Sequence, residues 1–193
     1  MARPTDFDRD TVIQKAQEVF WTKGYNGTSM QDLVDATQLN RSSIYNSFGS
    51  KHDLFQETLK DYAKDFDKVM AAIRAEDLNG YDTIEQLYLF LLAQIQMDSC
   101  NKGCMLINCK TELANEDEKL GRFLDKNLNQ VAISFVDLVT QGQADGSINK
   151  GLNPEQTAYY LTSVFHGMRI TGLYNKDRKI LKGIIKNAMI TLT

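Results

Sequence analysis

The sequence predicts an all-α protein in two parts, a small N-terminal domain of three helices and a larger C-terminal helical domain. Apolar residues recur at helical spacing along most of the 193 residues. The chain holds only two prolines, which favours long uninterrupted helices. Residues 28–51 show two short helical patterns around a tight turn, which is typical of a helix-turn-helix. We therefore expect domains at residues 1–52 and 53–193.

The composition is that of an ordinary globular chain. Hydrophobic residues make up 42% and charged residues 24%, with a net charge of −3. The sequence contains no apolar run long enough to cross a bilayer, and its start lacks the basic and apolar segments of a signal peptide. We therefore expect a cytoplasmic protein.

The first predicted helix begins near Asp8 or Arg9 and ends at Lys23. Its apolar residues share one face at helical spacing: Val12, Ile13, Ala16, Val19 and Phe20. Gly24 follows as a left-handed cap, a conformation that glycine adopts at little cost. This helix is expected to support the helix-turn-helix that follows it.

Two capping signals define the helix-turn-helix. Ser29 caps its first helix, and Asp32, three residues later, completes a capping box. After a short turn, Asn40 caps a second helix that ends at Phe48, before Gly49. The turn between the helices is as short as this motif requires.

The second short helix has one apolar and one polar side. Ile44 and Phe48 share the inward side, and Ser42 and Asn46 lie opposite. Arg41 can reach a phosphate or the O6 and N7 atoms of a guanine, while Asn46 can pair with an adenine edge. By itself, such a helix would equally suit a surface that only faces water.

The bulk charge does not indicate a nucleic-acid partner. Residues 1–55 carry six Lys or Arg and seven Asp or Glu, which gives −1. The local pattern differs, because the segment from Gln38 to His52 contains Arg41 and Lys51 and no acidic residue. A small cationic face can suffice to attract phosphates.

A set of aromatic, glycine, aliphatic and polar residues lies in and around this motif: Phe20, Trp21, Gly24, Tyr25, Thr28, Ile44, Tyr45, Phe48, Lys51, Leu54 and Phe55. This set resembles the signature of the tetracycline-repressor (TetR) family of transcriptional regulators. The resemblance implies a sequence-specific DNA-binding regulator that binds palindromic, double-stranded operator DNA as a homodimer. It also implies a repressor released from its operator by a small-molecule inducer.

The resemblance adds phosphate contacts from Thr28, Tyr45 and Lys51, which fix the position of a protein on DNA without reading its sequence. With the groups of the second short helix, the expected DNA-binding residues are Thr28, Ser29, Asn40, Arg41, Ser42, Tyr45, Asn46 and Lys51.

The C-terminal domain is expected to begin with a long helix capped by Ser50 and Asp53. Gly80 is expected to break the helical pattern, and Thr83 to cap a helix over residues 84–97. Two further helices are expected, a short one at 104–113 and a longer one at about 116–144.

The resemblance assigns the C-terminal helices a ligand and a second subunit. Aromatic, methionine, cysteine and histidine side chains suggest a pocket for a mostly apolar small molecule: Tyr62, Phe66, Met70, Tyr88, Cys104, Met105 and His166. Two more helices are expected, one that Asn153 and Pro154 begin and a last one that includes residues 180–192. Their apolar residues suggest a dimer interface: Ala158, Leu161, Phe165, Met168, Ile184, Ile185 and Met189.

Catalytic and metal-binding patterns are missing from the sequence. The two histidines, His52 and His166, have no Glu three positions earlier, as a di-iron bundle would require. No glycine-rich phosphate loop or nucleophile elbow appears. We therefore expect no enzyme activity, no cofactor and no metal.

Two alternatives remain open at this point. In the first, Cys104 beside Gly103 at a helix start is an oxidant or electrophile sensor in a regulator of the same fold. Buried inert thiols are the simpler reading of Cys100, Cys104 and Cys109. In the second, the chain is a helical interaction or carrier module that does not bind DNA.

Overall fold

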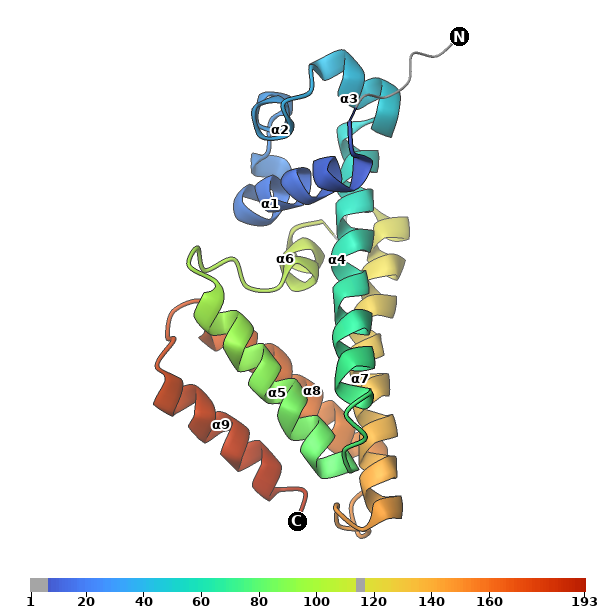
Figure 1. The fold of residues 1–193 in the computed structure, drawn as a ribbon, viewed down its shortest axis with the longest axis vertical. Helices are drawn as coiled ribbons and strands as arrows, with labels where there is room; N and C mark the ends of the chain where they lie inside the picture. Colours follow the sequence, from blue (N-terminus) through green and yellow to red (C-terminus); the bar gives the residue numbers. More distant parts are fainter. Residues whose placement is uncertain (1–6, 114–116) are drawn as a thin grey trace. The chain divides into compact units, whose positions relative to one another are not determined.

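The computed structural model describes residues 7–113 and 117–193, which form nine α-helices and no strand (Figure 1). The prediction of an all-α fold is confirmed. The helices are α1 Arg9–Gly27, α2 Met30–Thr37, α3 Arg41–Phe48, α4 Lys51–Arg74, α5 Gly80–Met97, α6 Met105–Leu113, α7 Glu118–Asp145, α8 Pro154–Thr171 and α9 Arg178–Ile190. None of these helices has the length and apolar character needed to span a membrane.

The chain divides into two compact units. Unit 1 comprises Met1–Phe66 and Met105–Leu124, and unit 2 comprises Asp67–Cys104 and Asp125–Thr193. This division does not follow the expected boundary after residue 52. The first part of α4, the whole of α6 and the start of α7 belong with the N-terminal helices instead.

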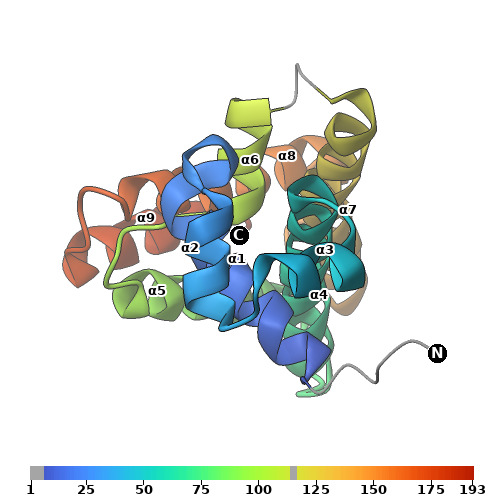
Figure 2. The same cartoon turned by 90° about the horizontal axis from the view of Figure 1, so that it is seen from above.

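Unit 1 is built around α1. This helix packs against α2 and α6, and α2 packs against α3 (Figure 2). Phe20 of α1 lies edge-on to Phe55 of α4, with 4.9 Å between ring centroids, a favourable geometry for aromatic pairs. Both rings are buried, as are Leu33 of α2 and Ile44 of α3, so one small core joins four helices.

In unit 2, α5 packs against both α8 and α9, and α8 packs against α9 (Figure 1). Tyr88 of α5 is fully buried, with its ring centroid 5.8 Å from Phe135 of α7 and 6.1 Å from Phe165 of α8. Its hydroxyl donates to the Leu161 carbonyl at 2.7 Å, so the buried oxygen has a hydrogen-bond partner.

The start of α5 corrects the sequence analysis. Gly80 is the first residue of this helix, capped by Asn79, whose side-chain oxygen accepts from the Asp82 N–H at 2.8 Å. A Cβ at Gly80 would collide with the backbone of Gly142 in α7, so this glycine permits close helix packing. Thr83, expected as the cap, lies buried within the helix.

Candidate nucleic-acid interface

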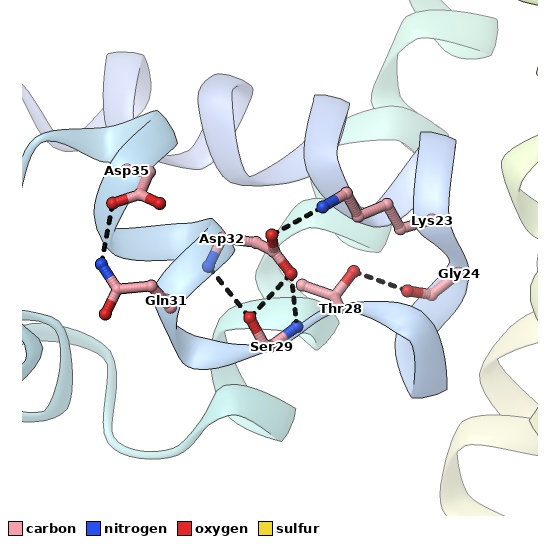
Figure 3. Close-up of polar contacts among 7 residues, drawn as sticks. All are labelled: Lys23, Gly24, Thr28, Ser29, Gln31, Asp32 and Asp35. Atoms are coloured by element: carbon pink, nitrogen blue, oxygen red, sulfur yellow. Dashed lines mark hydrogen bonds and ion pairs between the residues drawn. The ribbon is translucent and has the colours of Figure 1, made fainter.

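The first helix of the motif, α2, begins at the capping box that the sequence predicted (Figure 3). The Ser29 hydroxyl oxygen accepts from the Asp32 N–H at 3.1 Å, and the Asp32 carboxylate accepts from the Ser29 N–H at 2.8 Å. Lys23 of α1 donates to the same carboxylate at 2.6 Å. The bonds from Lys23 and Ser29 hold the pKa of Asp32 well below its ordinary value.

The turn between α2 and α3 is fixed by side chains at both ends. Gln38 ends α2 in a left-handed conformation with φ of 62°, and its N–H donates to the Val34 carbonyl at 2.9 Å. Asn40 caps α3 as predicted, because its side-chain oxygen accepts from the Ser43 N–H at 2.8 Å. Because this residue is Gln38 and not a glycine, the sequence did not indicate its left-handed conformation.

The two sides of α3 lie as the sequence predicted. Ile44 and Phe48 are buried in unit 1 and anchor the helix. Four side chains on the other side are exposed: Arg41, Ser42, Tyr45 and Asn46. Tyr45 is 44% exposed although it is aromatic. This exposed set, which we call the α3 polar face, offers hydrogen-bonding groups and one cation to a partner.

Thr28 does not lie on a surface that DNA could reach. It is 1% exposed, and its hydroxyl donates to the Gly24 carbonyl at 2.6 Å (Figure 3). The expectation that Thr28 contacts a phosphate is therefore wrong. A small hydroxyl residue after α1 instead closes the last turn of that helix.

The remaining expected DNA contacts border the α3 polar face. Ser29 is exposed but donates its hydroxyl to Asp32 at 2.7 Å, and Asn40 is exposed while its oxygen caps α3. The Lys51 ammonium is half-buried, 4.4 Å from the centre of the Tyr25 ring. Burial lowers the pKa of Lys51, against the opposing effect of nearby carboxylates.

Arg9 supports α3 in a way that the sequence analysis missed. Its guanidinium lies 4.2 Å from the centre of the Phe48 ring, donates to the Ser47 carbonyl at 2.8 Å and pairs with Glu57 of α4 at 2.7 Å. One side chain thus joins α1, the end of α3 and α4. Its partners lie 38 and 48 residues away, so no local pattern could have indicated them.

A second missed contact joins α6 to the end of α1. Gly24 has φ of 74° and ψ of 171°, which interrupts α1 and leaves the next N–H groups outside the helical ladder. The Glu112 carboxylate of α6 accepts from the N–H of Tyr25 at 3.1 Å and of Asn26 at 2.8 Å. We call this contact the Glu112 clasp. Gly24 was predicted as a left-handed cap, whereas Glu112 had no assigned role.

The expected ligand-binding residues do not gather at one site within a unit. Tyr62, Phe66 and Met105 belong to unit 1, and Met70, Tyr88, Cys104 and His166 belong to unit 2. Tyr88 is buried in the aromatic core, and its hydroxyl donates to the Leu161 carbonyl. Of the set, Met105 lines a cavity in unit 1.

Most of the residues expected at a dimer interface are enclosed within their own subunit. Six of the seven are buried in their own subunit: Ala158, Leu161, Phe165, Met168, Ile185 and Met189. A side chain enclosed in this way has no surface left for a partner. Ile184 is half-buried. The exposed large apolar side chains of this region are Tyr159, Tyr160, Ile170, Leu173, Tyr174, Ile180 and Ile190.

The buried cysteines do not have the features of reactive thiols, and the metal-binding side chains of the described residues do not form a cluster. Cys100 is exposed, whereas Cys104 and Cys109 are buried, and all three thiols are free. Burial raises the pKa of Cys109 to about 12, with the charges of Glu112 and Asp117 adding to the effect. Across the described residues, no three His, Cys, Asp or Glu side chains are grouped to hold a metal ion.

Two family descriptions match most of the chain. Residues 12–58 match the model for bacterial regulatory proteins, tetR family, and residues 80–186 match that for the tetracyclin repressor-like C-terminal domain. The first match contains the whole helix-turn-helix, and the second begins at the first residue of α5.

Named relatives and solved structures agree with these matches. The HTH-type transcriptional repressor ComR of Escherichia coli (strain K12) is 28% identical over 170 residues, which are 88% of this chain and 81% of ComR. The HTH-type regulator YezE of Bacillus subtilis (strain 168) is 29% identical over 151 residues, or 77% of each chain. A cysteine mutant of the TetR family regulator CifR, complexed with 26-base-pair operator DNA, has a TM-score of 0.88 at 26% identity. That likeness covers 99% of this chain and 100% of CifR.

Proposed function

Since the chain belongs to the tetR family of bacterial regulatory proteins and is a DNA-binding transcriptional regulator, we propose that it is a ligand-released repressor. In this proposal it binds a palindromic operator as a homodimer and leaves it when a small molecule binds. The observation that carries the proposal is the α3 polar face, held outward by the buried anchors Ile44 and Phe48. The family is one of regulatory proteins, and we propose no catalytic role for this chain.

The α3 polar face has the groups that a major groove can bind. Arg41 can make paired hydrogen bonds to guanine O6 and N7 or bind a phosphate, and Asn46 can pair with adenine. The Tyr45 and Ser42 hydroxyls suit phosphate oxygens. The Asn40 cap and the Arg9 contact fix both ends of α3, which lowers the entropy lost on binding.

An apolar surface on α8 and α9 supports the dimer. Tyr159 and Ile170 are exposed on one side of α8 at helical spacing, and Tyr174 is exposed in the turn that follows this helix. Ile180 is exposed on α9. Large exposed apolar surfaces of this kind mark protein interfaces. A two-fold dimer would present two copies of α3 about 34–36 Å apart to successive major grooves.

Release by a small molecule follows from a shift between two populations. A ligand that binds better to a dimer geometry in which the α3 helices no longer match the grooves lowers DNA affinity. The coupling is reciprocal, so operator DNA lowers ligand affinity by the same factor. The carrier module is not favoured, because ComR is named a repressor and CifR an operator-bound regulator. The thiol sensor of the same fold is not favoured, because Cys104 and Cys109 are buried and burial raises the pKa of Cys109.

The test is operator binding by two matched variants. Arg41→Ala should weaken binding to DNA from the upstream region of the protein's own gene by about 1–3 kcal/mol, roughly tenfold or more. Lys15→Ala removes an exposed cation of α1 in the same unit and should leave affinity nearly unchanged. Fluorescence anisotropy measures both affinities. Equal affinities for folded Arg41→Ala and Lys15→Ala would contradict the assignment of the reading surface to α3.

A further inference from the structure

Unit 1 contains a cavity of about 270 Å³ between α1, α4 and α6. Phe20 and Trp21 of α1, together with Phe55 of α4, supply aromatic surface. Met105 and Cys109 of α6 supply sulfur. All the lining residues belong to unit 1, so the cavity is a property of one compact body.

The size and lining of the cavity specify a class of ligand. An apolar cavity of about 150 Å³ can hold a benzene molecule, so this volume suits one or two rings. Aromatic faces and polarizable sulfur atoms favour flat, apolar partners. The cavity also has one strong acceptor, because the Glu112 carboxylate is part of its wall.

The position of the cavity connects it to the DNA-binding helices. Lys23 and Gly24 also line it, and Lys23 is the residue that pairs with Asp32 in the capping box of α2. The Glu112 clasp holds the segment between Gly24 and α2. A ligand that bonds to Glu112 therefore competes with the backbone N–H groups that fix the start of the helix-turn-helix.

We propose that this cavity binds a flat, largely apolar molecule of one or two rings that carries an N–H or O–H donor, and that the donor bonds to Glu112 and loosens the clasp. The site deepens the proposed function and rests on it, because it names where the inducer acts. It differs from the set of ligand residues expected from the sequence, with which it shares only Met105.

The first measurement is direct binding of 2-naphthol, a two-ring compound with one O–H donor, to the full-length protein. Trp21 is the one tryptophan of the chain and lines the cavity, so its fluorescence reports occupancy. Asn108→Phe places a ring at the cavity wall from an exposed position of α6. Thr111→Phe is the matched control, because Thr111 is exposed on the same helix and does not line the cavity.

We expect saturable, one-to-one quenching of Trp21 in the wild type and in Thr111→Phe, with the dissociation constant raised about tenfold or more in Asn108→Phe. Thr22→Phe, which fills the cavity from α1, should have the same effect and replaces Asn108→Phe if that variant does not fold. Equal affinities in the filled and control variants, or no saturable quenching, would overturn the proposal.

The second measurement follows the clasp by amide hydrogen exchange. Bound 2-naphthol should speed exchange of the Tyr25 and Asn26 amides, whereas simple filling of a cavity would slow it or leave it unchanged. Both measurements are made without DNA. If the protein binds 2-naphthol but no operator DNA, the result contradicts only the proposed function. If it binds operator DNA but shows neither saturable quenching of Trp21 nor faster exchange of the Tyr25 and Asn26 amides, the result contradicts only this inference.

Discussion

The two units expose opposite kinds of helical surface. On α3 of unit 1, the exposed side chains are short and polar or cationic, such as Arg41 and Asn46. On α8 and its following turn in unit 2, several exposed side chains are large and apolar, and Tyr174 is 78% exposed. The first surface suits a hydrated polyanion, and the second suits another protein surface. The difference indicates that one chain presents two separate binding surfaces.

The largest effect is expected from a substitution in the core of unit 2, compared with one on the exposed α3 polar face of unit 1. Phe135 is fully buried between Tyr88 and Phe165 in unit 2. Phe135→Ala should lower the free energy of unfolding by about 3–5 kcal/mol, through lost burial and the cavity that it leaves. Asn46→Ala, on the α3 polar face, should change it by less than about 0.5 kcal/mol. Urea unfolding measures both, and a similar effect of the two variants would contradict this contrast.

The ease of prediction differed between local and long-range contacts for a physical reason. The capping boxes of Ser29 with Asp32 and of Ser50 with Asp53 join residues three apart, so the sequence displays them directly. The Glu112 clasp joins residues 86 and 87 apart, and only the folded chain reveals it.

On α8, the sequence could not show which face turns inward. Apolar residues occupy two sides of this helix, so helical periodicity leaves both candidates for the core. The side of Leu161 and Phe165 is buried, and the side of Tyr159 and Ile170 is exposed. The residues expected at the interface therefore lie on the buried side, while the inward anchors of the shorter α3 were predicted correctly.

The pH dependence of stability should identify unit 2 as the acid-sensitive unit. Burial, with the nearby charge of Arg169, lowers the pKa of His166 to about 4 from the ordinary 6.5. The folded state disfavours protonation of His166, so the neutral imidazole contributes to the free energy of unfolding. This contribution is fully present above pH 6.5 and is lost as the pH falls toward 4. Between pH 7.5 and pH 5 the wild type should lose about 2 kcal/mol more than His166→Gln. Urea unfolding at the two pH values measures the difference, and parallel losses would refute the role of His166.

A charge on the apolar surface of unit 2 should separate subunits and leave the fold intact. Tyr159→Glu introduces a carboxylate into the exposed stripe of α8 and should weaken dimerisation by about 2 kcal/mol or more. Glu155→Gln, at an exposed position in the first turn of the same helix, is the control. Sedimentation equilibrium gives the dimer dissociation constants. A folded Tyr159→Glu protein with an unaltered constant would remove α8 from the interface.

The smallest expected effect concerns the cap of α2. Ser29→Ala removes the hydroxyl that accepts from the Asp32 N–H and should cost about 1 kcal/mol. Ser163→Ala is the control. The Ser163 hydroxyl lies on the exposed side of α8 and donates to the Tyr159 carbonyl of the same helix, so it caps no helix end. Thermal unfolding compares them. The reverse order of destabilisation would contradict the importance of the capping box.

The division of labour between the two surfaces is tested most directly by photo-crosslinking in the presence of operator DNA. Benzoylphenylalanine is placed at the position of Asn46 in one protein and of Tyr159 in another, both of which are exposed sites. We predict that the first crosslinks to DNA and the second to another copy of the chain. Crosslinking of position 159 to DNA, with position 46 joined to neither DNA nor protein, would contradict the account.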